Sequence, residues 1–405
     1  MNCRHCNEQL EHTFVDLGFA PPSNAYLGEG DLHKPESYFP LQVKVCEHCW
    51  LVQTEDYNQA DELFNDDYAY FSSTSSSWLE HASKYTNQIV GKLELGTDSF
   101  VIELASNDGY LLRNFLQKKI PCLGIEPTES TALVAEKLGI EVIREFFSVP
   151  LANKLVEQNR QADLVIGNNV FAHVPDINDF TSGMKRVLKP EGTITLEFPH
   201  LLNLVTYRQF DTIYHEHYSY LSLSAVQKIF SAHGLNIYDV EEIPTHGGSI
   251  RVYGCHQESG MEIKPVVDAM LNKELSCGLQ DIQAYSDFQD VVEEIKLHFL
   301  EFLITAKKNG KKVAAYGAAA KGNTLLNYAG IKPDLLPFVC DAAKAKQGKY
   351  LPGSHIPVLS PDQLKKFQPD YLLILPWNIA GEIKGLNLFR PSTRFVTVIP
   401  ELVIE

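Results

Sequence analysis

Long apolar runs are absent from this chain. No stretch of the 405 residues is apolar over the length that a membrane-spanning helix needs. The first residues, MNCRHC, contain no apolar core of a signal peptide. The sequence therefore predicts a protein without a membrane partner, and a cytoplasmic location is expected.

Positive charge is also scarce. Lys and Arg number 35 against 51 Asp and Glu, which gives a formal net charge of −16 at pH 7. Nucleic-acid affinity comes mainly from clustered Lys and Arg, so no nucleic-acid partner is expected. A small anionic ligand stays possible, because it needs only a local basic pocket. The length and the 44% hydrophobic residues predict a globular protein of two or three domains.

Strand and helix patterns alternate through the middle of the chain. The apolar strand patterns and amphipathic helix patterns follow in this order: 100–104, 111–116, 121–125, 128–138, 162–167 and 192–198. This alternation predicts a parallel sheet flanked by helices. One long amphipathic helix is predicted over 282–302, where apolar residues recur three and four apart. A second α/β unit follows from residue 311, with strand patterns at 336–340, 371–375 and 394–399.

Four of the eight cysteines form two close pairs. Cys3-x-x-Cys6 and Cys46-x-x-Cys49 supply four soft thiolate ligands, enough for a closed tetrahedral Zn²⁺ site. In a reducing compartment this spacing favours metal over disulfides. A complete thiolate shell leaves no position for a substrate, so the zinc is predicted to be structural. His5 and His48, inside the pairs, are predicted to be bystanders.

The turn Glu-Leu-Ala-Ser-Asn-Asp-Gly at 103–109 is a candidate cofactor site. Backbone can approach a ligand there, and Glu126, after the next strand pattern, can accept hydrogen bonds from ribose hydroxyls. A single glycine makes a poor dinucleotide motif and favours S-adenosylmethionine, which has no pyrophosphate; a plain turn is the alternative. The candidate cofactor residues are Glu103, Ser106, Asn107, Asp108, Gly109, Glu126 and, at the end of the 162–167 strand pattern, Asn168 and Asn169.

The segment 211–217, Asp-Thr-Ile-Tyr-His-Glu-His, gathers four consecutive side chains that can carry or hold a proton. A buried core cannot hold such groups without partners, so the segment is predicted to face a cleft and to carry out proton chemistry. It is not a zinc-protease motif, because residue 219 is Ser where a second His is required. His173 follows the Asn pair and is a further candidate; a satisfied structural histidine is the alternative.

Two loops of small residues are candidates for substrate binding. The loop at 245–251, Thr-His-Gly-Gly-Ser-Ile-Arg, allows close backbone approach, and Arg251 offers a guanidinium to phosphate; a hairpin turn with a surface arginine is the alternative. The loop at 316–323 joins a strand to a helix and places Lys321 among small residues, which favours a diphosphate. Three lysines that follow add positive charge near this loop: Lys344, Lys346 and Lys349. The alternative is that they belong to a solvated loop.

Taken in order, these features resemble the three-domain sugar C-methyltransferases, which act on nucleotide-linked 4-keto-deoxyhexoses. The resemblance covers the whole chain and rests on the four cysteines and on the segments 103–109, 211–217, 245–249, 317–323 and 376–378. It implies an α/β protein with a zinc-binding domain over 1–75, a central class I S-adenosylmethionine methyltransferase domain of Rossmann-like fold over 76–280, and a second Rossmann-like domain over 281–405. A monomer suffices for this arrangement.

The resemblance also implies roles. His217 is the general base, Tyr214, Glu216 and His173 lie in the active site, and Tyr68, or else Tyr70, comes from the zinc domain. A C-4 ketone acidifies the C-3 proton, and imidazole titrates in the range needed to remove it. The implied contacts to the nucleotide-diphosphate sugar are His246, Gly248, Ser249, Arg251, Tyr316, Gly317, Ala318, Lys321, Asn323 and Asn378.

Two alternatives stay open from the sequence. An O- or N-methyltransferase for another small molecule keeps the cofactor site and needs no carbanion. A zinc-ribbon nucleic-acid-binding or scaffold protein keeps only the cysteines, and the acidic composition argues against it. The nucleotide, thymidine or guanosine diphosphate, also stays open.

Overall fold

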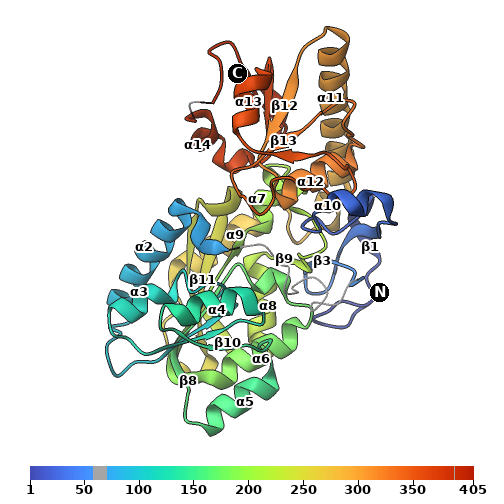
Figure 1. Ribbon diagram of the computed structural model, residues 1–405. Helices are drawn as coiled ribbons and strands as arrows, with labels where there is room; N and C mark the ends of the chain where they lie inside the picture. The colour runs from blue at the N-terminus through green and yellow to red at the C-terminus, as the bar shows by residue number, and fades with distance from the viewer. Residues whose placement is uncertain (58–70, 387) are drawn as a thin grey trace.

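β-Sheets organise the chain in the computed structural model, which describes residues 1–57, 71–386 and 388–405. Figure 1 shows the N-terminal part beside the central part, with the C-terminal part above both. Within the described residues the sheets have four, seven and six strands. Tyr68, the tyrosine expected from the zinc domain, and its neighbour Tyr70 lie outside the described residues.

The N-terminal sheet is antiparallel and has the order β1-β2-β3-β9. Its first strands are β1 (His12–Ala20), β2 (Phe39–Val45) and β3 (Val52–Thr54). The fourth, β9 (Ser219–Tyr220), comes from the middle of the chain, immediately after the ionisable segment 211–217. The zinc-binding part is therefore joined by backbone hydrogen bonds to the residues that directly follow the segment predicted to carry the chemistry.

The central sheet has the order β10-β11-β8-β7-β4-β5-β6. Five strands are parallel, and four of them were predicted: β4 (Val101–Leu104), β5 (Cys122–Ile125), β7 (Ala162–Asn168) and β8 (Leu188–Pro199). The fifth, β6 (Glu141–Ile143), was not predicted. The other two, β10 (Leu235–Ile243) and β11 (Ser249–His256), form an antiparallel hairpin that was not predicted as part of this sheet. The hairpin alternative for residues 245–251 is thus confirmed, although Arg251 is buried.

Helices cover both faces of the central sheet. Successive residues of a strand point to opposite faces, so Val101 and Ile102 belong to different hydrophobic clusters. One face is covered by α2 (Ser76–Lys92), α3 (Leu112–Gln117) and α4 (Glu129–Lys137). The other is covered by α5 (Val149–Glu157), α6 (Ile177–Val187), α8 (Leu223–Ala232) and α9 (Pro265–Ser276).

The C-terminal sheet has the order β14-β13-β12-β15-β16-β17 and is parallel except for β17. Its elements are β12 (Val313–Tyr316), α12 (Ala320–Tyr328), β13 (Val339–Cys340), β14 (Val358–Leu359), α13 (Asp362–Phe367), β15 (Tyr371–Ile374), α14 (Ala380–Lys384), β16 (Arg394–Thr397) and β17 (Val403–Ile404). This second α/β unit confirms the prediction for the region after residue 311.

The helix predicted over 282–302 consists of two helices. α10 (Ile282–Ser286) ends before Asp287, and α11 (Phe288–Lys308) follows. Ser286 Oγ lies 2.8 Å from the Gln283 carbonyl oxygen and 3.3 Å from Asp287 Oδ1. Such side-chain hydrogen bonds compete with helical backbone bonds, which accounts for the break. Even so, the described part of the chain contains no helix long and apolar enough to cross a membrane.

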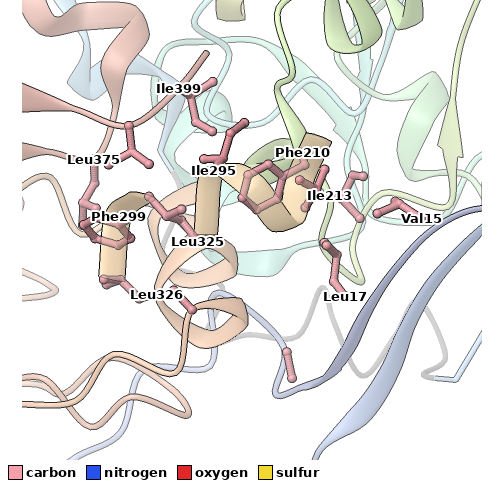
Figure 2. Close-up of a cluster of buried hydrophobic side chains, with 14 of the residues drawn as sticks. Val15, Leu17, Phe210, Ile213, Ile295, Phe299, Leu325, Leu326, Leu375 and Ile399 are labelled. Atoms are coloured by element: carbon pink, nitrogen blue, oxygen red, sulfur yellow. The ribbon is translucent and has the colours of Figure 1, made fainter. Parts of the chain in front are cut away.

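One hydrophobic cluster joins the N-terminal sheet to the C-terminal unit. Figure 2 shows Val15 and Leu17 of β1 on one side of Phe210 and Ile213, with Leu325 of α12 on the other. Phe210 and Ile213 have no exposed surface. Burial of apolar side chains is the main favourable term in folding. The start of the segment 211–217 is therefore anchored in a core shared by both ends of the chain.

Gly109 shows how tightly the turn after β4 is packed. Its φ is +76°, and a Cβ there would lie 2.5 Å from Ile140 Cδ1 and 3.1 Å from Ala135 Cβ. The sequence assigned this glycine to a cofactor; the structure shows that a side chain here would collide with the neighbouring helix and loop.

We expect Gly109→Ala to lower the free energy of unfolding by roughly 2–4 kcal/mol, because left-handed strain and overpacking add. Gly139→Ala is the matched control: its φ is +85°, but the nearest atom would be 3.8 Å away. It should lose only the strain contribution. Urea denaturation of both variants measures the difference, and equal losses would contradict the packing argument.

Candidate active site

A cavity of about 580 Å³ lies where the three parts of the chain meet. Its wall includes Asn24 from the N-terminal part, Asn107 and His217 from the central part, and Lys321 and Asn378 from the C-terminal unit. This volume lies in the range of small-molecule sites, and such sites commonly form between domains. The segment 211–217, the turn after β4 and the loop after β12, distant in sequence, therefore contribute to one cavity.

Four residues of the cavity wall have left-handed backbone conformations that are uncommon without glycine. They are Ala105 (φ 55°), Asn107 (φ 49°), Asn169 (φ 52°) and His246 (φ 54°). Strained conformations of this kind persist only where the surroundings impose them, and they cluster at functional sites. Four of the twelve non-glycine residues with positive φ among the described residues therefore line this cavity.

One side of the cavity is the carboxyl edge of the central sheet. Asn107, Glu126 and Asn168 line it. Glu126 accepts backbone hydrogen bonds from Asn107 and Thr128, each at 2.9 Å, while burial raises its pKa. The Asn168 side chain is buried, and neither atom of its amide has a hydrogen-bond partner among the described residues. Unsatisfied buried amides are costly, so this edge fits a polar ligand such as S-adenosylmethionine.

Four other predicted cofactor residues lie behind this wall: Glu103, Ser106, Asp108 and Gly109. Asp108 accepts the backbone N–H of Ser73 at 3.0 Å and so anchors the short turn that precedes α2. Burial raises the pKa of Glu103 well above its usual value, and the nearby Asp108 and Glu126 add to the effect. In the structure these four residues pack behind the turn, and Asn107 of the turn lines the cavity.

Two histidines face each other in the cavity. His173 ends η3 (Phe171–His173), and its ring centroid lies 4.6 Å from that of His217. Nδ1 of His217 lies 2.9 Å from the backbone carbonyl oxygen of Thr212. Nδ1 of His173 lies 2.8 Å from the backbone carbonyl oxygen of Glu216. A carbonyl only accepts, so each Nδ1 carries the proton, and Nε2 of each neutral ring carries a lone pair.

Burial keeps both rings neutral. It lowers the pKa of His173 to about 4 and that of His217 well below its usual value, with the neighbouring His173 adding to the effect on His217. A neutral imidazole with a lone pair on Nε2 can accept a proton. The predicted proton chemistry of this segment therefore has a physical basis in the structure.

The other side chains of the segment differ in their surroundings. The Tyr214 ring centroid is 4.0 Å from that of His217, and both line the cavity. Glu216 also lines it and accepts two hydrogen bonds from Asn24 Nδ2, at 2.7 and 2.9 Å. Burial raises the Glu216 pKa to about 7, and the Asn24 bonds oppose this shift. His215 lies outside the wall, with Nε2 at 3.2 Å from the Pro40 carbonyl oxygen.

Two lysines of the C-terminal unit, Lys321 and Lys346, add positive charge to the cavity wall. Lys321 donates to Asn378 Oδ1 at 2.9 Å and lies 4.7 Å from the Trp377 ring centroid. Lys346 donates to the Ala318 carbonyl at 2.7 Å. Burial lowers the pKa of both lysines. The sequence analysis treated Lys346 like Lys344 and Lys349, as one of three loop lysines. In the structure Lys344 is exposed, whereas Lys346 lies in the cavity wall.

Arg251 does not reach the cavity. Its guanidinium is buried and pairs with Glu197 at 2.9 Å and Glu241 at 3.3 Å, while Cζ lies 4.4 Å from the Tyr85 ring centroid. This corrects both expectations for Arg251, because two carboxylates already occupy the groups that a phosphate would need and the side chain is not at the surface.

The glycines of the two small-residue loops have a packing role in the structure. A Cβ on Gly248 would collide with the side chain of Asn203, and one on Gly317 with the ring of Pro376. Neither residue lines the cavity, in contrast to the expected approach to a ligand. His246, two residues before Gly248, does line it, and its Nδ1 has no partner among the described residues.

Most of the other predicted substrate contacts tie protein segments together. Asn323 donates to the Ser23 carbonyl at 2.6 Å, and Ser249 donates to the Thr245 carbonyl at 3.0 Å. The Ala318 carbonyl accepts the Tyr26 hydroxyl at 2.6 Å. Tyr316 is buried at the end of β12. Of the ten predicted contacts, His246, Lys321 and Asn378 line the cavity.

The sequence analysis missed several wall residues. Asn24 and Trp78 lie in segments without a recognisable motif. The Trp78 ring stacks on His81 at 4.8 Å and meets His246 edge-on at 5.0 Å. Phe146, with 47% of its surface exposed, also lines the cavity. A half-exposed aromatic after a strand is a weak signal by itself.

The four paired cysteines converge at one point. All four Sγ atoms lie within 4.8 Å of one another, with Cys3–Cys49 and Cys6–Cys46 at 3.5 Å. Zn–S bonds of about 2.3 Å in a tetrahedron place sulfurs about 3.8 Å apart. The geometry fits Zn²⁺, and four thiolates leave no open position. The metal would therefore hold the two cysteine pairs together and would not contact a substrate.

Comparisons with known proteins cover nearly the whole chain. A zinc binding domain family matches residues 3–64, a methyltransferase domain family 78–240, and a C-methyltransferase C-terminal domain family 244–400. C-methyltransferase NovU of Streptomyces niveus is 36% identical over 401 residues, which cover 98% of this chain and 95% of that protein.

Solved structures match part of the chain. Magnesium protoporphyrin IX methyltransferase of Synechocystis with bound S-adenosylmethionine has 12% identity and a TM-score of 0.36, and the match covers 50% of this chain and 100% of that one. A Pyrococcus horikoshii protein has 15% identity and a TM-score of 0.39, with 46% and 95% covered.

We expect the purified protein to hold about one zinc ion per chain. Cys6→Ser should lower the zinc content and the melting temperature together, because three thiolates bind the metal more weakly and the pairs then separate. Cys277→Ser, at an exposed cysteine outside the cluster, is the control. Atomic absorption and thermal melting measure both quantities; a metal-free protein whose folding ignores chelators would contradict the assignment.

Proposed function

The chain belongs to the S-adenosylmethionine-dependent C-methyltransferases, and from this premise we propose that it methylates a nucleotide-linked 4-keto-6-deoxyhexose at C-3, beside the ketone. One observation carries the proposal. The neutral histidine pair lines the same cavity as residues of the carboxyl edge of the central sheet and the two cavity lysines. A base that shares a cavity with a methyl-donor site and two lysines suits a carbon acid that bears an anionic group.

His217 is the proposed general base. Its Nδ1–H is held by the Thr212 carbonyl, so Nε2 accepts the proton from the sugar carbon. Removal of a proton beside a ketone gives an enolate, because the charge spreads onto the ketone oxygen. That electron pair would form the bond from carbon to the donated methyl, while the sulfur–methyl bond of the donor breaks and its electron pair stays on sulfur, which leaves S-adenosylhomocysteine. The proton remains on His217 until solvent removes it.

The enolate oxygen needs hydrogen-bond donors. His173 presents a lone pair on Nε2 while its ring is neutral, so it is suited to accept and not to donate. The Tyr214 hydroxyl and the Lys321 ammonium line the same cavity and can donate. We therefore assign enolate stabilisation to these two side chains and the placement of a sugar hydroxyl to His173.

The two cavity lysines favour the diphosphate. Removing an ammonium group from water is costly unless an anion or hydrogen bonds compensate. Lys321 contacts a neutral amide and an aromatic ring, and Asp211 is a nearby carboxylate. Lys346 contacts a carbonyl, with Asp341 at 3.9 Å. A phosphate bound between the lysines would pair directly with both ammonium groups.

S-adenosylmethionine, when bound, supplies an electrophilic methyl group on a sulfonium. Glu126 would accept from its ribose hydroxyls, and the unpartnered amide of Asn168 lies at the same edge. Trp78 and Phe146 provide apolar surface on this part of the wall. The main contribution of the protein to the second step is the placement of two reactants, which lowers a barrier by several kcal/mol.

Incubation with S-adenosylmethionine and a panel of nucleotide-linked 4-keto-6-deoxyhexoses tests the proposal. We expect one member to gain a methylene in mass and to show a new quaternary carbon at C-3 by NMR. His217→Asn should lower kcat by roughly 10²- to 10⁴-fold, because the general base is lost, while S-adenosylmethionine binding by calorimetry is unchanged.

His298→Asn, at an exposed histidine of α11 outside the cavity wall, is the matched control and should turn over normally. Near-normal turnover by His217→Asn would remove this residue from the role of base. A quaternary carbon at C-5, the other neighbour of the ketone, would correct the position, and methyl transfer to oxygen or nitrogen would replace the carbanion mechanism altogether.

The rate should be insensitive to mild acid. A base acts in its unprotonated form, and burial lowers the pKa of His217 well below its usual value, so Nε2 stays unprotonated as pH falls through 6.5. We expect less than about a twofold change in kcat between roughly pH 7.5 and 6, whereas an unperturbed histidine would lose about half its activity near pH 6.5. A pH–rate profile measures this, and an acid limb centred at 6.5 would contradict it.

A further inference from the structure

Arg4 and His5 lie between the first two metal-binding cysteines, and the sequence assigned His5 no function. The Arg4 side chain is only 6% exposed. It donates from one Nη to the Pro175 carbonyl at 2.8 Å and from the other to the Thr54 carbonyl at 2.7 Å, and it pairs with Asp56 at 2.8 Å. This arginine thus binds two distant backbone segments from within the cysteine pair.

Both segments lead directly to the histidine pair. Pro175 follows His173 by two residues. Thr54 donates from Oγ1 to the His217 carbonyl at 3.1 Å and from its N–H to the Tyr218 carbonyl at 3.1 Å. Arg4 Cζ also lies 5.4 Å from the Tyr218 ring centroid. One guanidinium therefore fixes the backbone beside each histidine.

The cysteine pair is itself held rigidly against the central part. Asn178 of α6 donates to the carbonyls of His5 and Arg4, at 2.8 and 3.3 Å, and its Oδ1 lies 2.8 Å from His5 Nδ1. Gln53 accepts the Arg4 N–H at 2.9 Å and donates to Cys3 Sγ at 3.2 Å. The arginine is therefore anchored at its backbone as well as at its guanidinium.

We propose that Arg4 is a positioning residue for the reaction: from the cysteine pair it fixes the backbone on which His173 and His217 are carried. Charge-assisted bonds to two carbonyls resist displacement more strongly than neutral ones. A shift of about 1 Å between reacting groups can lower a rate by about 100-fold. The inference rests on the proposed function, because it assigns importance to the separation of these two rings.

Arg4→Met tests the inference in the full-length zinc-loaded protein. Met keeps an apolar stem and removes the donors. We expect kcat to fall by roughly 10- to 100-fold while the Kd for S-adenosylmethionine changes less than about twofold and zinc content stays at wild-type level. The imidazole ¹⁵N signals of His173 and His217 should shift, which a merely structural role would not require.

Arg160→Met is the matched control. Arg160 pairs with Glu141 at 2.7 Å and lies 5.4 Å from the Phe100 ring centroid, so its loss removes an ion pair and an aromatic contact like those of Arg4 but no bonds to backbone carbonyls. The backbone segments next to His173 and His217 are not among its partners. The control should therefore keep wild-type kcat and wild-type histidine signals.

Arg4→Lys covers the case in which Arg4→Met folds poorly. Lysine keeps the charge but lacks the planar fork that reaches two carbonyls, so an intermediate loss of kcat is expected. Wild-type kcat and histidine signals in the folded Arg4 variants would overturn the inference. If His217→Asn turns over normally, the proposed function fails and the Arg4 inference is still open to test. The imidazole ¹⁵N signals of the Arg4 variants then decide alone whether Arg4 positions the two rings.

Discussion

Desolvation of ionisable side chains where three parts of the chain meet is the constraint on which the site depends. In water, His217 and Glu216 would have ordinary pKa values. In the structure, burial lowers the first and raises the second, to about 7 for Glu216. A neutral imidazole that keeps its lone pair and a carboxyl group that is easily protonated are both consequences of removal from water.

Contacts from both ends of the chain maintain this burial. Asn24 from the N-terminal part holds the Glu216 carboxylate, and Trp377 from the C-terminal unit donates to Asp211 at 2.8 Å. Thr324 of α12 donates to the Ile213 carbonyl at 2.7 Å. The segment 211–217 is thus fixed from several sides and is at the same time a principal contact between the parts.

Membership in the C-methyltransferases argues against the alternative interpretation of the chain as a zinc-ribbon nucleic-acid-binding or scaffold protein.

Local patterns predicted well those features whose physics is local. The CxxC pairs indicated a metal cluster because two sulfurs three residues apart turn toward one metal, and the structure brings all four sulfurs together. The alternation of strands and helices indicated parallel sheets. The break at Asp287 and the buried Arg251 were not predictable in the same way, because periodicity does not show which side-chain oxygen competes with a helix or which carboxylates surround a guanidinium.

The sequence by itself indicated the classes of site: a thiolate cluster, a turn suited to S-adenosylmethionine, a segment of ionisable side chains and a lysine among small residues. Tertiary structure decided which residues meet. It placed Lys346 in the cavity, turned His215 away, and made Gly248 and Gly317 packing positions. The reason is that desolvation, tautomer and steric fit depend on neighbours that are distant in sequence, and no local pattern carries that information.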